Sequence, residues 1–273
     1  MTTDDEREAT LADYARWLRS WGASPATIGA RVWLARSRHR AWGNSPADLT
    51  PERLESWLAD LEDRNWTKPT YHANLSDYCA WLVATGRLES SPMGGVRRAK
   101  RPNKRPRPLS EAEVRRVLAV AAGDTRTWIM LALLAGLRAH EIAKLRGEDV
   151  SEDGIYVDGK GGVSVTLPCH PDLWEIAEQY PRQGYWFPSP RRDGPILPRT
   201  ISTVVGRLFR ECGIESGSIH RVRHVYATRL LRAGVNVRSV QQLMRHASLD
   251  TTAGYTAVDE DELRAAVNLL TAS

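Results

Sequence analysis

The stretch His220-Arg-Val-Arg-His-Val-Tyr-Ala-Thr228 carries two histidines and a central arginine at helical spacing. On an α-helix, positions i, i+3 and i+4 share a face, so we expect His220, Arg223 and His224 to project together. The His-x-x-x-His spacing is also half of a zinc site, but Arg221 stands where a metalloprotease has glutamate, and packed cations oppose a metal ion. They suit an anion, because a planar guanidinium binds two phosphate oxygens at once. The stretch therefore predicts a phosphate-binding helix, with an exposed basic helix as the alternative.

An apolar helix is expected to end at Gly136 in Ala135-Gly-Leu-Arg-Ala-His-Glu141. Glycine tolerates the backbone angles of a helix end, and Arg138 then stands at the start of the next turn. Glu141 lies one turn further on, where its carboxylate can hold a neighbouring guanidinium in position. Alone, the segment is weak evidence of a site.

A β-hairpin is predicted where Ile155-Tyr-Val157 and Val163-Ser-Val-Thr-Leu167 flank Asp158-Gly-Lys-Gly-Gly162. The glycines tolerate the positive φ angles of a tight turn. Lys160 lies at the tip, from which it can reach a site built by the helices. Most such lysines only keep a turn soluble.

The segment from Leu243 to Tyr255 begins as a helix end that bears His246 and continues as a small, polar, turn-prone stretch. An isolated tyrosine such as Tyr255 is often a core anchor. Here it follows, in one domain, an arginine, a lysine, a His-x-x-Arg pair and a histidine. That order makes Tyr255 a candidate nucleophile.

A basic linker, residues 93–109, separates two predicted domains, 1–92 and 110–273. It holds three prolines, seven cations and no acid, so it is expected to be extended. It is either a solvated spacer or a strap along DNA phosphates, and we favour the strap because a spacer needs no seven cations. Ser110-Glu-Ala-Glu113 then predicts a capping box that opens the second domain. The candidate DNA-binding residues are Arg97, Arg98, Lys100, Arg101, Lys104, Arg105 and Arg107.

The first third reads as short helices that start at Ser24-Pro25 and Thr50-Pro51, where the hydroxyl residue caps the helix and proline takes its first position. Apolar residues at helical spacing predict a shared core, and the tryptophans among them are interpreted as core side chains. The stripes are Leu11, Tyr14, Trp17 and Leu18, then Leu54, Trp57, Leu58 and Leu61, then Leu75, Tyr78 and Leu82.

The composition describes a chain with a sizeable core and a modest excess of positive charge. It is 42% hydrophobic with a formal net charge of +5, which favours a polyanionic partner. The three cysteines form no CxxC pair and indicate neither a disulfide framework nor a cysteine zinc site. The densest apolar run, Trp128 to Ala135, is too short to cross a bilayer, and the acidic amino terminus lacks an apolar core. We expect a soluble protein in the cytoplasm of a bacterial host.

Over nearly its whole length the chain resembles the tyrosine recombinase family, which includes phage integrases and chromosome-dimer resolvases. The family's T-G-L-R-x-x-E signature is matched by Ala135-Gly-Leu-Arg138 with Glu141, and its H-x-L-R-H stretch by 220–224. The hairpin lysine is matched by Lys160, and the L-G-H…Y stretch by Met244-Arg-His246 with Tyr255. The departures, none at a position that performs chemistry, are Ala135 for threonine, Val222 for leucine and Arg245 for glycine.

The resemblance implies a mainly α fold: a SAM-like helical core-binding domain and a mixed α+β catalytic domain with a small antiparallel sheet. Arg138 and Arg223 would clamp a DNA phosphate while Tyr255 attacks it and forms a 3′-phosphotyrosyl link. The reaction would need no metal, ATP or other cofactor. The remaining implied roles are His220 as base, Lys160 as proton donor, His246 as a hydrogen-bond donor to the phosphate, and Glu141 and His224 as supporting residues.

The implied partner is double-stranded DNA with paired inverted half-sites, held in a C-shaped clamp, with a dimer on each site and a working homotetramer. The final helix, 259–270, has Leu263, Val267 and Leu270 on one face, which pack either into a neighbouring protomer or on their own domain. Integration and excision of phage DNA is the favoured role. The alternatives are dimer resolution, transposon movement and a DNA-binding protein of the same fold that does not cut, while the lack of a carboxylate cluster disfavours a metal-dependent nuclease.

Overall fold

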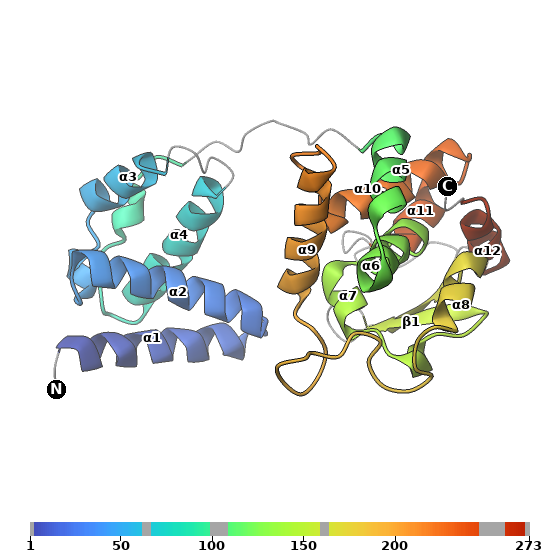
Figure 1. Cartoon of the computed structure of the whole chain (residues 1–273). Helices are drawn as coiled ribbons and strands as arrows, with labels where there is room; N and C mark the ends of the chain where they lie inside the picture. Colours follow the sequence, from blue (N-terminus) through green and yellow to red (C-terminus); the bar gives the residue numbers. More distant parts are fainter. Residues whose placement is uncertain (1–2, 62–66, 99–108, 159–163, 246–259, 271–273) are drawn as a thin grey trace. The chain divides into compact units, whose positions relative to one another are not determined.

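The computed structural model describes residues 3–61, 67–98, 109–158, 164–245 and 260–270 and divides the chain into two compact units (Figure 1). These units are Met1–Arg105 and Pro106–Ser273, so the division falls inside the stretch predicted as a linker. The domain limits of 1–92, 93–109 and 110–273 stay a prediction.

The first unit is a bundle of α-helices, as predicted. Ser24 caps the second helix through its Oγ, which accepts a hydrogen bond from the Thr27 N–H at 3.2 Å, and Thr50 caps the third in the same way at 3.4 Å. The helices enclose an apolar core that contains a buried hydrogen bond between His39 Nε2 and the Tyr78 hydroxyl at 2.8 Å. The elements are α1 (Thr3–Ser20), α2 (Pro25–Trp42), η1 (Pro46–Asp48), α3 (Pro51–Ala59), α4 (Lys68–Ala84) and η3 (Pro92–Gly94).

The assignment of the tryptophans to the core is wrong for part of the set. Of the two tryptophans in the predicted stripes, Trp57 is partly buried against the core and Trp17 is 39% exposed. Outside the stripes, Trp81 is buried, whereas Trp21 and Trp33 are 53% and 58% exposed. Trp17 follows the helical period, yet its ring lies over the edge of the core and stacks on Tyr14 with the centroids 5.8 Å apart. Periodicity gives a side chain's direction and not its depth, so a large ring at the border of the apolar stripe stays half outside.

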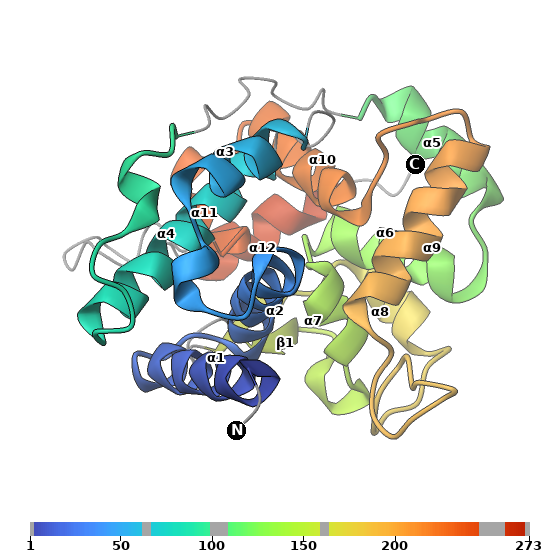
Figure 2. The same ribbon diagram turned by 90° about the vertical axis from the view of Figure 1, so that its left-hand side faces the viewer.

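The second unit is mainly helical and contains one two-stranded antiparallel sheet. In Figures 1 and 2, α6 lies among the other helices of this unit, and it packs against α7, α8, α9 and α10. Its residues from Thr127 to Leu134 are all buried, so the apolar run predicted as a helix forms the centre of the core. The elements are α5 (Glu111–Val120), α6 (Gly123–Leu134), α7 (Ala139–Lys144), η4 (Gly147–Asp149), β1 (Gly154–Asp158), β2 (Ser164–Pro168), α8 (Pro171–Ala177), α9 (Pro198–Glu211), α10 (Ile219–Arg232), α11 (Val237–Leu243) and α12 (Glu260–Asn268).

The capping box and the strand pairing predicted for this unit are confirmed. Ser110 and Glu113 form the predicted capping box, with the Ser110 N–H donating to Glu113 Oε2 at 2.7 Å. β1 and β2 pair from Gly154 opposite Pro168 to Asp158 opposite Ser164, which confirms the strand pairing of the predicted hairpin, while its turn at 159–163 lies outside the described residues. The helix α8 was not foreseen, although its start is capped by the ring of His170, a residue type less usual at helix starts than serine or aspartate.

The final helix packs on its own unit in this chain. Leu263, Val267 and Leu270 are buried in the core of the second unit, as the apolar stripe predicted. Ser239 on α11 donates to Glu262 Oε1 at 2.7 Å, and His170 Nε2 lies 3.0 Å from the Leu270 carbonyl oxygen. In this single chain the stripe packs on its own domain, and packing into a neighbouring protomer stays a prediction.

Two further findings concern membrane spans and cysteines. Within the described ranges, no helix is both long enough and apolar enough to span a bilayer. The thiols of Cys79, Cys169 and Cys212 are free.

Candidate active site

The turn between α6 and α7 places the first candidate arginine. Gly136 has a φ of +59°, and a Cβ there would lie 2.6 Å from a ring carbon of Tyr226, so only glycine fits. The chain then reaches Arg138, which precedes α7 in an extended conformation. Its backbone N–H donates to Glu141 Oε2 at 2.6 Å and its Nη1 to Glu141 Oε1 at 3.0 Å. Glu141 thus holds the guanidinium of Arg138, as the sequence suggested.

Glu141 is the centre of a larger cluster. Its side chain is 3% exposed, and its Oε2 accepts a hydrogen bond from Arg245 Nη2 at 2.6 Å and lies 3.8 Å from Arg223 Nη1. Three guanidiniums therefore surround one buried carboxylate, which leaves two positive charges unbalanced within the cluster. We refer to Arg138, Glu141, Arg223 and Arg245 as the arginine cluster.

The accessible face of the arginine cluster is provided by Arg138. Its side chain is 33% exposed, against 2% for Arg223 and 9% for Arg245. A group arriving from solvent therefore meets the side chain of Arg138 first.

The side chain of Arg223 points into the protein. It leaves α10 toward the turns at either end of the cluster, with Nη1 donating to the Gly136 carbonyl and Nη2 to the Met244 carbonyl. His220 and His224, in contrast, are exposed, so the expectation that all three side chains project together is only partly right. Arg223 lies about one turn after His220 and directly before His224 on the helix, but on the border of the buried face, where its long side chain can reach inward.

The two histidines contact each other. Their Nε2 atoms are 3.1 Å apart and their rings meet edge to face, with the centroids 4.5 Å apart. Partial desolvation by neighbouring atoms, and then the positive charge of Arg223, lower the pKa of His224 from its usual value, which favours the neutral ring. One Nε2 then donates to the other, and the pair can accept or pass on a proton at the surface of α10.

The electrostatics of the arginine cluster favour an anion. Burial lowers the pKa of Arg223, and the neighbouring charges of Arg138 and Arg245 lower it further. Burial also raises the pKa of the Glu141 carboxyl, but the guanidinium of Arg245 and the hydrogen bonds from Arg138 outweigh it, so the net shift is downward. Glu141 therefore stays ionised, and a phosphate beside Arg138 would relieve the repulsion among the three cations.

Sequence reasoning missed Arg245. The resemblance marked this position only as a departure from glycine, away from the chemistry. The structure gives it a φ of +49°, a left-handed conformation that few side-chain-bearing residues adopt, and turns its side chain to Glu141. A large charged residue at a position normally held by glycine was the signal that could have found it.

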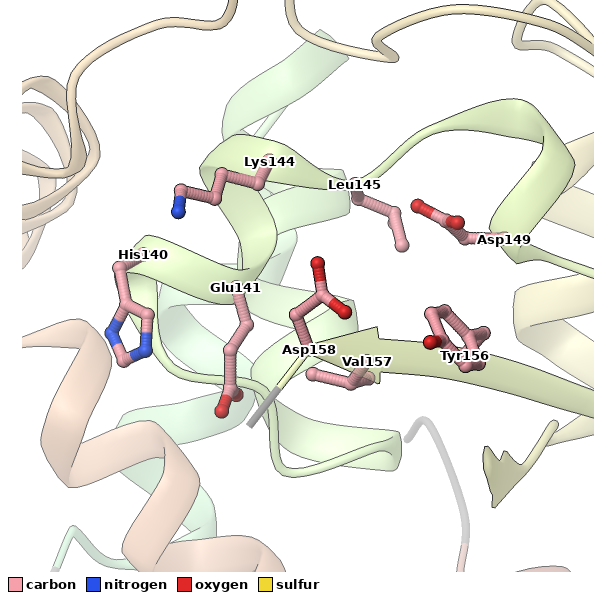
Figure 3. A pocket seen from close by; sticks show the side chains of 8 residues that line it. All are labelled: His140, Glu141, Lys144, Leu145, Asp149, Tyr156, Val157 and Asp158. Atoms are coloured by element: carbon pink, nitrogen blue, oxygen red, sulfur yellow. The ribbon is translucent and has the colours of Figure 1, made fainter. Parts of the chain in front are cut away.

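A pocket of about 60 Å³ lies beside the arginine cluster, between α7 and β1 (Figure 3). Figure 3 shows the Asp158 carboxylate, at the end of β1, turned toward α7, which contributes His140, Glu141 and Lys144. Lys160 follows Asp158 by two residues. Its own position is outside the described residues, so its role stays a prediction.

Of the remaining predicted site residues, some lie within the described ranges and some outside them. Arg97 and Arg98 are described and exposed, and the backbone N–H of Arg97 lies 3.4 Å from Glu55 Oε1. Among the residues that the structure covers, no group of three or more His, Cys, Asp or Glu side chains could hold a metal ion. The predicted residues that are not described are Lys100, Arg101, Lys104, Arg105, Arg107, Lys160, His246 and Tyr255.

Comparison with known proteins places this cluster in a family. The phage integrase family model matches residues 107–262, which contain the whole arginine cluster. This chain belongs to the phage integrase family. Among curated members of the family, the tyrosine recombinase XerA of Pyrococcus horikoshii is 33% identical over 269 residues, covering 94% of this chain and 92% of XerA.

Solved structures of the family agree with this membership. The integrase of mycobacterium phage Brujita is 38% identical, with 97% of this chain and 93% of that one covered and a TM-score of 0.58. Lambda integrase shares the fold at 20% identity. The structure of its residues 75–356, a dimer bound to a COC′ core site, matches over 92% of this chain and 99% of the lambda integrase chain, with a TM-score of 0.72. The structure of a lambda integrase tetramer bound to a Holliday junction matches over 91% of this chain and 80% of the lambda integrase chain, also with a TM-score of 0.72.

Proposed function

We propose that this protein recombines DNA at specific sites by cutting a strand with Tyr255 and rejoining it. Membership of the tyrosine recombinases supports site-specific recombination as the activity. The observation that carries the chemistry is the arginine cluster, in which two unbalanced positive charges lie around a buried carboxylate and reach solvent through Arg138. Such a cluster suits a phosphodiester, whose negative oxygens otherwise repel a nucleophile.

In the proposed reaction, Arg138 contacts a non-bridging oxygen of the phosphate that is cut. Arg223 adds positive charge from behind, and its guanidinium has more N–H donors than the two carbonyls of Gly136 and Met244 use. Fixed donors of this kind stabilise the charge that builds on phosphorus without reorganising. Glu141 keeps both arginines in place and takes no part in bond making.

Tyr255 supplies the attacking oxygen. The phenol loses its proton to His220, whose ring is paired with the neutral His224, and forms a bond to phosphorus. The 5′-oxygen leaves with a proton from Lys160, and His246 donates a hydrogen bond to the phosphate. Because the phosphoester energy is kept in the 3′-phosphotyrosyl link, the 5′-hydroxyl of a second strand can attack phosphorus, release Tyr255 and restore a phosphodiester.

The DNA event that we propose is integration and excision of phage DNA. The similarity to the integrase of mycobacterium phage Brujita supports it, at 38% identity over nearly all of both chains. Dimer resolution of the Xer type is the second candidate, favoured by the 33% identity to XerA of Pyrococcus horikoshii. Neighbouring phage genes and a flanking tRNA gene would support integration, whereas a recombination site at a chromosomal terminus would support resolution.

The proposed assembly is a dimer on two inverted half-sites and a tetramer on two such sites. The lambda integrase dimer on a core site and tetramer on a Holliday junction support it. The basic stretch 93–109 joins the two units and follows the DNA backbone between them, with its cations against phosphates.

The test of the nucleophile is Tyr255→Phe, which keeps the ring and removes only the phenolic oxygen. On nicked suicide DNA that carries the site, the wild-type protein is expected to form an adduct that survives denaturant. The Tyr255→Phe protein is expected to bind the same DNA with unchanged affinity and form none. An adduct formed by Tyr255→Phe would show that another residue attacks.

A further inference from the structure

We propose that Arg245 is a positioning residue of the phosphate site, which fixes Glu141 and, through it, the guanidinium of Arg138. This inference rests on the proposed function, since it assumes that Arg138 receives a DNA phosphate. It assigns a role to a side chain that the glycine usual at this position cannot supply.

The backbone at Arg245 gives the first argument. The helix α11 ends at Leu243, Met244 follows as its cap, and Arg245 then adopts a φ of +49°. Glycine takes this left-handed conformation without strain, whereas a residue with a Cβ does not. An arginine that stays in this conformation is held there by contacts that its side chain makes.

Those contacts reach the other turn of the site. Arg245 Nη2 donates to Glu141 Oε2 at 2.6 Å and lies 3.3 Å from the Gly136 carbonyl oxygen. The segment 136–141 is thus tied to the end of α11 across more than a hundred residues of sequence. The side chain is 9% exposed, so water competes little with these bonds.

Arg138 in turn contacts the backbone of the turn that holds Arg245. Its Nη2 donates to the carbonyl oxygen of Arg245 at 3.1 Å and lies 3.4 Å from that of Met244, while its Nη1 contacts Glu141. Arg245 therefore acts on Arg138 twice, once through the shared carboxylate and once through the backbone carbonyl that accepts from Arg138. Both routes fix the guanidinium of Arg138, the most exposed arginine side chain of the cluster.

The consequence for catalysis follows from this geometry. Without the Arg245 side chain, Glu141 Oε2 loses a charged partner, and the turn at 244–245 keeps only its backbone carbonyl contacts with Arg138 as a tie to the start of α7. Arg138 then samples more orientations, and misplacing a group that acts in the transition state slows the chemical step. Overall DNA affinity changes little, because it is spread over many phosphate contacts elsewhere.

The experiment compares full-length Arg245→Gly, Arg245→Lys and, as a matched control, Arg191→Gly. Arg191 is an exposed turn residue of the same unit outside the arginine cluster. Two quantities are measured on nicked suicide DNA carrying the site: the dissociation constant of the noncovalent complex, and the single-turnover rate of adduct formation at saturating protein. The unfolding midpoint of each variant is recorded as well.

Arg245→Gly is expected to slow adduct formation by at least about tenfold. Its dissociation constant is expected to stay within about threefold of wild type. Its unfolding midpoint is expected to stay within about 4 °C, because glycine suits the backbone angle and Glu141 keeps Arg138 and Arg223 as counter-ions. Arg245→Lys is expected to recover part of the rate, since its amine can reach Glu141 with a single bond, and Arg191→Gly to behave as wild type.

Two results would overturn the inference while leaving the proposed function intact. One is adduct formation by Arg245→Gly within about threefold of the wild-type rate. The other is a loss of rate that only mirrors a loss of affinity or of folded protein, which would make Arg245 a merely structural residue. If the wild-type protein forms no adduct at all, the proposed function fails, and this inference fails with it.

Discussion

Replacing Glu141 by glutamine removes the only negative charge of the arginine cluster while keeping the shape of the side chain. Glu141 is 3% exposed and holds Arg138 at 3.0 Å and Arg245 at 2.6 Å, with Arg223 at 3.8 Å. The glutamine amide can still accept hydrogen bonds through its oxygen, but it brings N–H donors to face guanidiniums and balances none of their charge. Two of the three cations, Arg223 and Arg245, are then buried without a counter-ion.

The magnitude follows from the burial of these groups. Breaking a buried ion pair by removing one partner costs about 3–5 kcal/mol, because the remaining charge is left desolvated and uncompensated. The free energy of unfolding of the second unit is expected to fall by about that amount in Glu141→Gln. Hydrogen exchange of the amides of α6 and α10, measured in the full-length protein, reports this unit by itself.

The matched control is Glu211→Gln. Glu211 pairs with Arg207 at 3.9 Å on α9, but both side chains are more than half exposed, at 62% and 65%. An exposed pair of this kind contributes little, so the control is expected to stay within about 0.5 kcal/mol of wild type.

The difference in the free energy of unfolding between wild type and Glu141→Gln is also expected to depend on pH. The pKa of Glu141 in the folded protein lies below its usual value of 4.5 despite burial. A carboxyl with a lowered pKa stabilises the fold fully above its unfolded pKa, and this stabilisation is lost as the pH falls through the folded pKa. The difference between wild type and Glu141→Gln is therefore expected to be constant from pH 6 to 8 and to shrink below about pH 4.5.

Two outcomes would refute the reasoning. A loss below about 1 kcal/mol at pH 7 would show that Glu141 is no buried counter-ion. A difference that persists unchanged in acid would show that its charge is not what stabilises the unit.

The remaining predictions concern the turn before α7, the first arginine and the basic stretch. Gly136→Ala is expected to destabilise the second unit by about 2 kcal/mol or more, since its Cβ meets Tyr226 at 2.6 Å. The control is Gly213→Ala, at a φ of +71° with open space around it, which is expected to cost only about 1 kcal/mol. If urea unfolding gave equal losses for the two variants, the clash with Tyr226 would not be the cause. Arg138→Lys keeps a charge but loses the forked geometry, so adduct formation is expected to fall by roughly a hundredfold with little change in DNA affinity, and an unchanged rate would exclude Arg138 from the phosphate site. Replacing Lys104, Arg105 and Arg107 by glutamine is expected to weaken binding to all DNA sequences and to flatten the salt dependence by roughly one unit of slope per lost phosphate contact; an unchanged slope would contradict the strap.

The parts of the site that short-range signals define could be predicted from the sequence. Gly136 at a helix end, Arg138 after it and Glu141 one turn later all depend on residues within a few positions of one another. The pairing of β1 with β2 and the Ser110 capping box are local in the same sense. Their geometry is set by backbone preferences that a sequence displays directly.

What escaped prediction depends on contacts between distant segments. The burial of Arg223 requires the Gly136 and Met244 carbonyls, which come from two other elements, and the role of Arg245 requires Glu141. The exposure of Trp17 and Trp33 depends on how far the bundle's core extends, which helical periodicity does not specify. Long-range contacts of this kind follow from the assembled fold and leave no period in the sequence.

The identity of the attacking residue is the central claim, and peptide mapping tests it most directly. The adduct of the wild-type protein with nicked suicide DNA is digested with nuclease and protease, and the peptide that keeps a nucleotide is sequenced by mass spectrometry. The expected result is a nucleotide joined through a 3′-phosphate to Tyr255. A nucleotide on any other residue, or one joined through a 5′-phosphate, would contradict the proposed mechanism.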